Sequence, residues 1–180
     1  HLPEKPSFQE DRFRIRRFQQ YHEKDYNFEM TRRGLWYSAM AGGVANIWGN
    51  LINPATGGDQ SYGMSFPYPK PEGIRTYADF FRNRFQRYMT RANDLTDGYC
   101  LKAMNNWHYV FYKEDASSIR MDLFGMPDAQ PAVAVDCKKA YEEIDLGTLN
   151  PENQTINLPR ASDWAIAVGI FENTRVKPER

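Results

Sequence analysis

The segment spanning residues 29–50 constrains the fold of this chain more than any other. Apolar residues recur there at helical spacing, which places Trp36 on the buried side of a helix, and the pair Gly42-Gly43 is typical of a helix end. An apolar run from Val44 to Trp48 follows at once and predicts a short buried strand. Because a helix, a tight turn and a buried strand make up half of a βα unit, the segment predicts a parallel strand arrangement.

The end of the predicted strand carries two residues of the same orientation. Asn46 and Trp48 lie two positions apart, so both side chains point to the same face of a strand. In a (β/α)8 barrel, side chains at the C-terminal ends of the strands face the active site. We interpret Trp48 as a platform for a substrate ring, the alternative being a core tryptophan that plugs the barrel end. Asn46 would hydrogen-bond either a substrate or a neighbouring strand.

A predicted strand before this segment and a predicted helix after it extend the pattern to two βα units. Residues 5–14 read as a strand that enters a charged loop, and Thr76 begins a capping-box pattern ahead of a helix whose apolar stripe runs to Met89. Residues 51–74 form a long connection rich in Gly, Pro, Asn and Tyr, which is typical of a functional or a disordered loop. Two βα units result, whereas a closed barrel takes eight strands and about 250 residues. We therefore expect the chain to begin in mid-fold, with a further polypeptide carrying the missing barrel strands.

The second half of the sequence has a different period. Short runs of β-type composition alternate with turn residues, which predicts an antiparallel β-sandwich. The runs lie at residues 99–104, 108–114, 117–123, 131–135, 155–158 and 164–171. The period changes between Asn93 and Asp97. The predicted fold class is thus α/β plus all-β, with the last two units of a (β/α)8 barrel in residues 1–95 and a β-sandwich in residues 96–180.

The run at residues 164–171 predicts a strand with one buried face and one outer face. Its large residues alternate with small ones, so the large set is expected to face the core of the sandwich. That set consists of Trp164, Ile166, Val168 and Ile170.

Composition narrows the classes of partner and cofactor. Lys plus Arg and Asp plus Glu both number 23, so no net field attracts nucleic acid, and no apolar run is long enough to cross a membrane. The three histidines lack the spacing of metal ligands, and no phosphate loop is present, so neither a metal nor a cofactor is expected. Aromatic residues make up 14% of the chain, which suits either a large core or a sugar-binding cleft. Cys100 and Cys137 would be two buried thiols or one disulfide.

Several motifs together resemble a known group of enzymes. The motifs are Glu-Asp-Arg-Phe-Arg at residues 10–14, Arg-Arg-Gly-Leu-Trp at 32–36, Ala-Gly-Gly-Val-Ala-Asn-Ile-Trp-Gly at 41–49 and Ser-Asp-Trp-Ala-Ile-Ala-Val-Gly at 162–169. The chain resembles the C-terminal part of apiosidase-like glycoside hydrolases, in which a TIM barrel precedes a β-sandwich labelled as a collagen-binding type of domain. The resemblance runs over nearly the whole chain, and the order of its elements is more specific than any single motif.

The resemblance implies roles for particular residues. Glu10 matches the catalytic nucleophile at the end of barrel strand seven, with Asp11 as its rival, while a solvated surface acid is the alternative. Arg12 would hold the carboxylate ionised, or would be a surface charge. His22 and Tyr62 lie in the loops after strands seven and eight, where barrel enzymes bind substrate, and the alternative for His22 is an ordinary loop histidine. The acid/base carboxylate of strand four has no counterpart in the 180 residues, so the chain alone would be inactive.

The function implied by the resemblance is hydrolysis of a glycosidic bond in a polysaccharide, with a carbohydrate as substrate. The location is left open by the sequence, and a secreted or periplasmic one is favoured. The alternative is a non-catalytic glycan-binding or structural protein on the same scaffold. In a third interpretation, the sandwich only buttresses the barrel.

Overall fold

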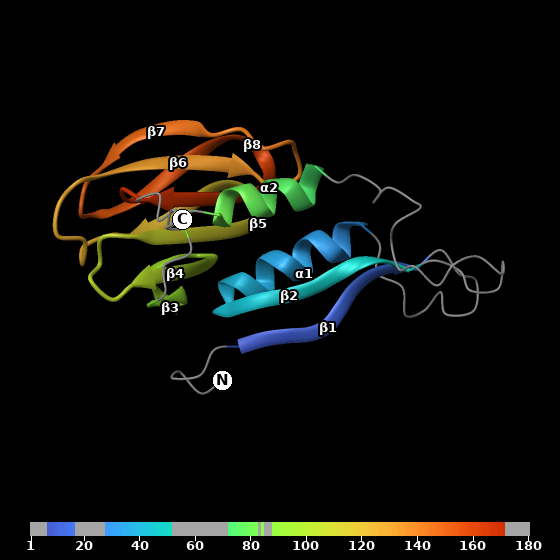
Figure 1. Cartoon of the computed structure of the whole chain (residues 1–180). Coiled ribbons are helices and arrows are strands. Elements are labelled where there is room, and N and C mark those ends of the chain that lie inside the picture. Colours follow the sequence, from blue (N-terminus) through green and yellow to red (C-terminus); the bar gives the residue numbers. More distant parts are fainter. Residues whose placement is uncertain (1–6, 17–27, 52–71, 83, 85–87, 172–180) are drawn as a thin grey trace, which may run out of the picture. The chain divides into compact units, whose positions relative to one another are not determined.

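The computed structural model describes residues 7–16, 28–51, 72–82, 84 and 88–171, and for residues 7–16 and 44–51 it describes the backbone alone (Figure 1). The chain divides into two compact units, residues 1–74 and 75–180. The division falls inside the second helix, ahead of the change in sequence period at residues 93–97. Assignment of residues 1–95 to a barrel stays a prediction.

The first unit contains a parallel strand pair with a helix between its strands in sequence. Strand β1 (Ser7–Arg16) pairs in parallel with β2 (Gly43–Leu51), and helix α1 (Phe28–Met40) contacts both. The buried residues of α1 include Leu35 and Trp36, which confirms the predicted core position of Trp36. Gly42 has a φ of 87°, and its amide donates to the Ala39 carbonyl at 2.8 Å. The predicted helix end is therefore confirmed, because only glycine takes that backbone conformation without strain.

The second helix differs from its prediction at both ends. Helix α2 spans Glu72–Phe81, so Thr76 lies inside it rather than at its start. The Thr76 hydroxyl donates to the Lys139 carbonyl at 2.6 Å, a contact between α2 and a loop distant in sequence. Met89 belongs to strand β3 (Met89–Arg91), which pairs with β4. The apolar stripe thus misled the prediction, because its last residue, Met89, pairs in a strand and does not belong to the helix.

The second unit is built on one antiparallel sheet of six strands. Its strands are β3, β4 (Tyr99–Ala103), β5 (Tyr109–Asp122), β6 (Gln130–Asp136), β7 (Ile144–Leu149) and β8 (Asn153–Val168), with a short 3-10 turn, η3 (Asn93–Leu95), before β4. They lie in the order β3-β4-β5-β8-β6-β7 (Figure 1). The predicted strands are all present, four of them merged into the two long strands β5 and β8. Strands β3 and β7 were not predicted.

The long strands β5 and β8 pair along their whole length across two irregularities. Between the pairs Lys113–Trp164 and Ala116–Ser162, β5 contains one extra residue, and Asp115 has a φ of 46° there. The next pair is Ser118–Asn157, so β8 carries additional residues that include a proline. Extra residues of this kind bend a strand, and proline in a sheet is confined to such sites or to edges.

The bend brings both halves of the long strands into one hydrophobic core. The core takes Phe111 and Ile166 from one side of the irregularities, and Ile119, Met121 and Leu158 from the other. The prediction of an antiparallel β-structure is therefore confirmed, while its form is one continuous sheet rather than two separate sheets.

The predicted orientation of the last strand is confirmed with one exception. Trp164, Ile166 and Val168 lie in the core, each fully buried. Ile170 is 66% exposed, because β8 ends at Val168 and Gly169 turns the chain with a φ of 120°. Ala167, on the opposite face, is also buried, so this strand is covered on both sides.

Candidate functional site

The strand pair of the first unit places four of the predicted site residues on adjacent strands. Glu10 and Arg12 belong to β1, and Asn46 and Trp48 belong to β2. Gln9 pairs with Asn46 and Phe13 pairs with Trp48, with a register shift between the two pairs. The predicted catalytic and stacking residues therefore lie on neighbouring backbone segments of a parallel pair.

The shift gives the predicted catalytic segment an irregular backbone. Between the pairs Gln9–Asn46 and Phe13–Trp48, β1 contains three residues, 10–12, whereas β2 contains one, Ile47. Irregularities of this type re-aim side chains and are over-represented next to active sites. No sequence pattern indicates this register shift. The prediction that Glu10 lies at the end of its strand is wrong, because β1 continues to Arg16. His22 and Tyr62 lie outside the described residues.

The second unit holds its buried carboxylates in ion pairs. Asp136, at the end of β6, accepts hydrogen bonds from Arg160 Nη2 at 2.6 Å and Ser162 Oγ at 2.7 Å. Burial raises the pKa of Asp136, but the hydrogen bonds from Arg160, Ser162 and the Lys138 amide outweigh it and leave the pKa below its ordinary value. This carboxylate therefore stays ionised and fixes the β8 bend to β6.

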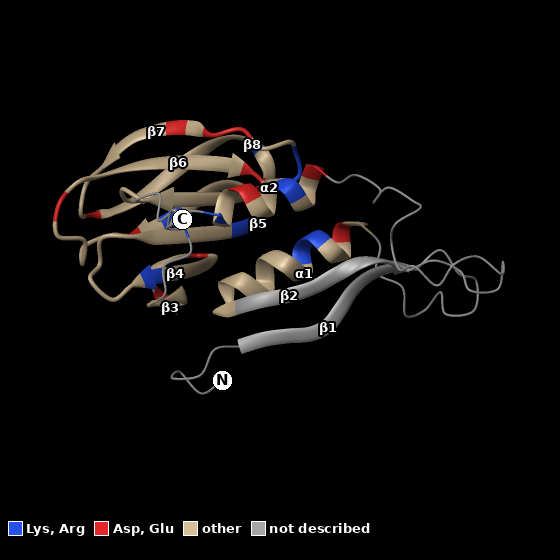
Figure 2. Ribbon diagram, in the orientation of Figure 1, with Lys and Arg blue, Asp and Glu red and all other residues tan. Residues whose placement is uncertain are grey.

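A second pair lies beside the first, and Figure 2 shows acidic and basic residues together where β6 ends. Asp163 is almost fully buried, and its Oδ1 lies 2.9 Å from Lys138 Nζ. The same oxygen accepts the Asp115 amide at 3.0 Å, and Asp115 Oδ1 also lies 2.9 Å from Lys138 Nζ. Burial lowers the pKa of Lys138, but Asp163 and Asp115 raise it more. The residues Ser162 and Asp163, which the resemblance singles out, thus hold the bend between β5 and β8.

A third group joins the end of α2 to the loop before β7. Arg84 Nη1 donates to the Tyr141 hydroxyl at 2.8 Å and to the Phe80 carbonyl at 3.2 Å. Arg84 also pairs with Glu143, which accepts a hydrogen bond from Tyr141. Burial raises the pKa of Glu143, and the hydrogen bonds from Tyr141 and Arg84 outweigh it, so the pKa is lowered.

The ion pairs of the second unit lower the pKa values of three of its carboxyl groups. Asp97, paired with Lys113 at 2.7 Å, also has a lowered pKa, since that bond and the Arg120 amide outweigh burial. A catalytic general acid needs a raised pKa to stay protonated near neutral pH. Among the described residues, every carboxyl group with a resolved shift is shifted the other way, so Asp97, Asp136 and Glu143 are held ionised and are not poised as general acids.

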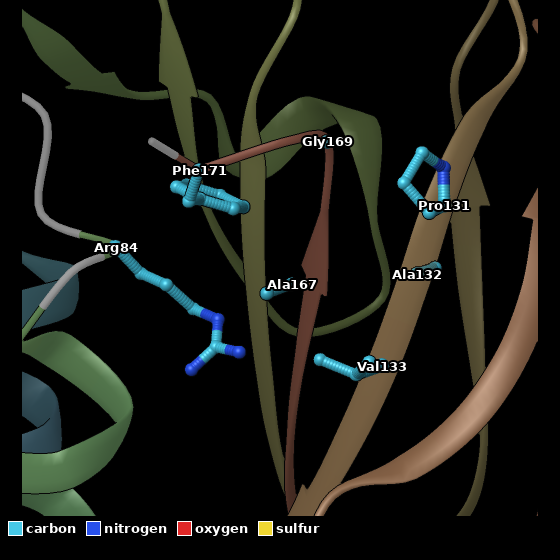
Figure 3. A pocket seen from close by; sticks show the side chains of 7 residues that line it. All are labelled: Arg84, Pro131, Ala132, Val133, Ala167, Gly169 and Phe171. Atoms are coloured by element: carbon cyan, nitrogen blue, oxygen red, sulfur yellow. The ribbon is translucent and has the colours of Figure 1, made fainter. Parts of the chain in front are cut away.

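An open pocket of about 210 Å³ lies on the outer side of β6 and β8. It is lined by Arg84, Pro131, Ala132, Val133, Ala167, Gly169 and Phe171 (Figure 3). Its walls are mainly apolar, and the Arg84 guanidinium is the charged group among them. Among the described residues, the lining contains no carboxylate.

Predictions from the sequence also concerned the cysteines, the possible metal ligands and the membrane-spanning segments. Cys100 and Cys137 are both buried and do not form a disulfide, which confirms the interpretation as two thiols. Burial raises the pKa of Cys100 far above its ordinary value, so that thiol is not a nucleophile. The described residues contain no cluster of three or more His, Cys, Asp or Glu able to hold a metal ion. Among the helices described, none is long and apolar enough to span a membrane.

Two solved structures resemble the fold of this chain. No protein-family model and no curated protein matches the sequence. A structure described as a glycoside hydrolase has a TM-score of 0.56 and 14% identity, over 79% of this chain and 37% of that one. A glycoside hydrolase family 5 structure from Bacteroides vulgatus ATCC 8482 has a TM-score of 0.60 and 14% identity, over 82% of this chain and 37% of its own. The similarity shows a shared fold, and the chain spans 37% of the length of these enzymes.

Proposed function

We propose that this chain is the C-terminal part of a glycoside hydrolase that cleaves glycosidic bonds in a polysaccharide. The observation that carries the proposal is the extent of the structural similarity, which covers 82% of the chain and therefore extends over residues of both units. Neither half alone is distinctive, but their order in one chain is what a barrel enzyme with an appended β-domain requires.

In the proposed mechanism, the Glu10 carboxylate is the nucleophile. It attacks the anomeric carbon, and an ester bond forms as the glycosidic bond breaks. The leaving oxygen takes its proton from a second carboxyl group, supplied by polypeptide outside these 180 residues. Water then releases the sugar. Trp48, whose partner across the strands is Phe13, stacks on the sugar ring, and Arg12 keeps Glu10 ionised.

Arg12, Asn46, His22 and Tyr62 complete the proposed substrate contacts. Asn46 is the backbone partner of Gln9, next to Glu10 in sequence, so it lies on the strand facing the nucleophile's segment. His22 and Tyr62 follow β1 and β2 in the chain, where the βα loops of a barrel form the substrate-binding face.

The test is hydrolysis by the complete protein, in which this chain is joined by the rest of the barrel. Activity on neutral plant and algal polysaccharides is measured as released reducing sugar. Glu10→Gln keeps the size of the side chain but removes the nucleophile, so we expect a loss of turnover of at least about 10³-fold. The matched control is Glu152→Gln, an identical change at an exposed position before β8.

The control should retain the activity of the unchanged protein. Near-normal turnover by Glu10→Gln would reject Glu10 as the nucleophile, and Asp11→Asn would then be measured. Absence of hydrolysis of every polysaccharide by the unchanged complete protein would reject the enzyme and favour a non-catalytic scaffold.

A further inference from the structure

The pocket on β6 and β8 has the size of a small ligand. Its volume, about 210 Å³, is below the roughly 300–1,000 Å³ of pockets that hold drug-sized molecules. In Figure 3 the Arg84 side chain extends toward the wall formed by Ala167 and Val133, while Phe171 and Pro131 lie at the other end. A single ring, or one unit of a longer chain, suits this space.

The charge of Arg84 is balanced inside the second unit. Glu143 pairs with its guanidinium, and the Tyr141 hydroxyl and the Phe80 carbonyl accept its Nη1 hydrogens. The side chain is only 14% exposed, so these partners fix its position. The pocket therefore offers a guanidinium group whose charge is already compensated, which favours an uncharged ligand over an anion.

The ring of Phe171 is held in place by its neighbours. It lies 4.8 Å from the His108 ring, centroid to centroid. His108 Nε2 lies 2.8 Å from the Ile170 carbonyl, which fastens the segment that carries Phe171. A Cβ atom on Gly169 would lie 2.4 Å from the Trp107 carbonyl, so glycine allows the Trp107 turn to pack against the pocket wall.

We propose that this pocket binds one uncharged sugar unit of a polysaccharide, with its apolar face on Phe171 and its hydroxyl groups near Arg84. Apolar walls with few, fixed polar groups are the usual composition of a small-molecule site, and a pyranose presents both kinds of surface. The choice of a sugar over another uncharged ring rests on the proposed function. The site would keep the enzyme on its polymer at a position other than Glu10.

The test is binding by the 180-residue chain, measured by titration calorimetry with four hexasaccharides. Three are neutral, from xylan, cellulose and mannan, and one is the charged hexagalacturonate. We expect at least one neutral probe to bind, and Phe171→Ala to weaken it about tenfold or more, equal to about 1.4 kcal/mol. The matched control is Phe124→Ala, the same change at a ring that is 70% exposed and outside the pocket lining.

A second variant tests the pocket independently, in case Phe171→Ala misfolds. Val133→Glu fills the pocket from β6 without altering Phe171 or Arg84, and it should also abolish binding while thermal unfolding remains cooperative. The proposal is overturned if no neutral probe binds, if hexagalacturonate binds best, or if Phe124→Ala weakens binding as much as Phe171→Ala. It is also overturned if Val133→Glu binds normally. Hydrolysis by the complete protein is measured separately, so failure of catalysis and failure of this site give different results.

Discussion

At the scale of single residues, the carboxylate of Asp136 is the most consequential group of the second unit. Its side chain is 7% exposed and bonded to Arg160 and Ser162, so Asp136→Asn leaves their donors with weaker partners. We expect a loss of about 1–3 kcal/mol in the free energy of unfolding at neutral pH. Because the folded pKa of Asp136 is lowered, the unfolded chain binds the proton more readily. The advantage of Asp136 over asparagine is therefore complete above about pH 5 and fades as the pH falls through the folded pKa. Urea unfolding from pH 3 to pH 7 measures this difference. The exposed Asp94→Asn is the control, and an equal pH dependence in both variants would refute the role of Asp136.

At the scale of elements, α2 is fastened to the sheet unit through Thr76. The hydroxyl is buried and donates to the Lys139 carbonyl at 2.6 Å. Thr76→Val keeps the shape of the side chain and removes the donor, so we expect about 1 kcal/mol less stability and faster amide hydrogen exchange in α2. Thr90→Val, at an exposed position of β3, makes the same change without this contact and should leave both measurements almost unaltered. Slower or unchanged exchange in α2 of the Thr76→Val protein would show that the helix is held by other contacts.

At the scale of the whole molecule, the sequence predicted local elements better than the contacts between them. The helix α1, its glycine end and the alternation of β8 were predictable, since each follows from a period or a turn residue within a few positions. Strand β7 was missed because it is short and because its alternation of Ile144 and Leu146 breaks at Gly147, after which the next apolar residue, Leu149, is out of phase. The ion pairs were beyond prediction, as Asp136 and Arg160 lie 24 positions apart and meet only because β6 and β8 are neighbours. The register shift beside Glu10 is likewise set by strand pairing and not by any local pattern. The structure thus describes the pairing of β1 with β2, whereas the catalytic and binding roles of residues on these strands stay predictions.

The most direct measurement of the central claim is covalent trapping of the nucleophile in the complete protein. A 2-deoxy-2-fluoro glycoside of the sugar that the complete protein hydrolyses slows release of the glycosyl-enzyme ester, because fluorine destabilises the oxocarbenium-like transition state. Peptide mapping by mass spectrometry then locates the sugar. The proposed function predicts one equivalent of label on the peptide that contains Glu10, absent from Glu10→Gln. Label on a different carboxylate, or steady hydrolysis with no covalent label, would contradict it.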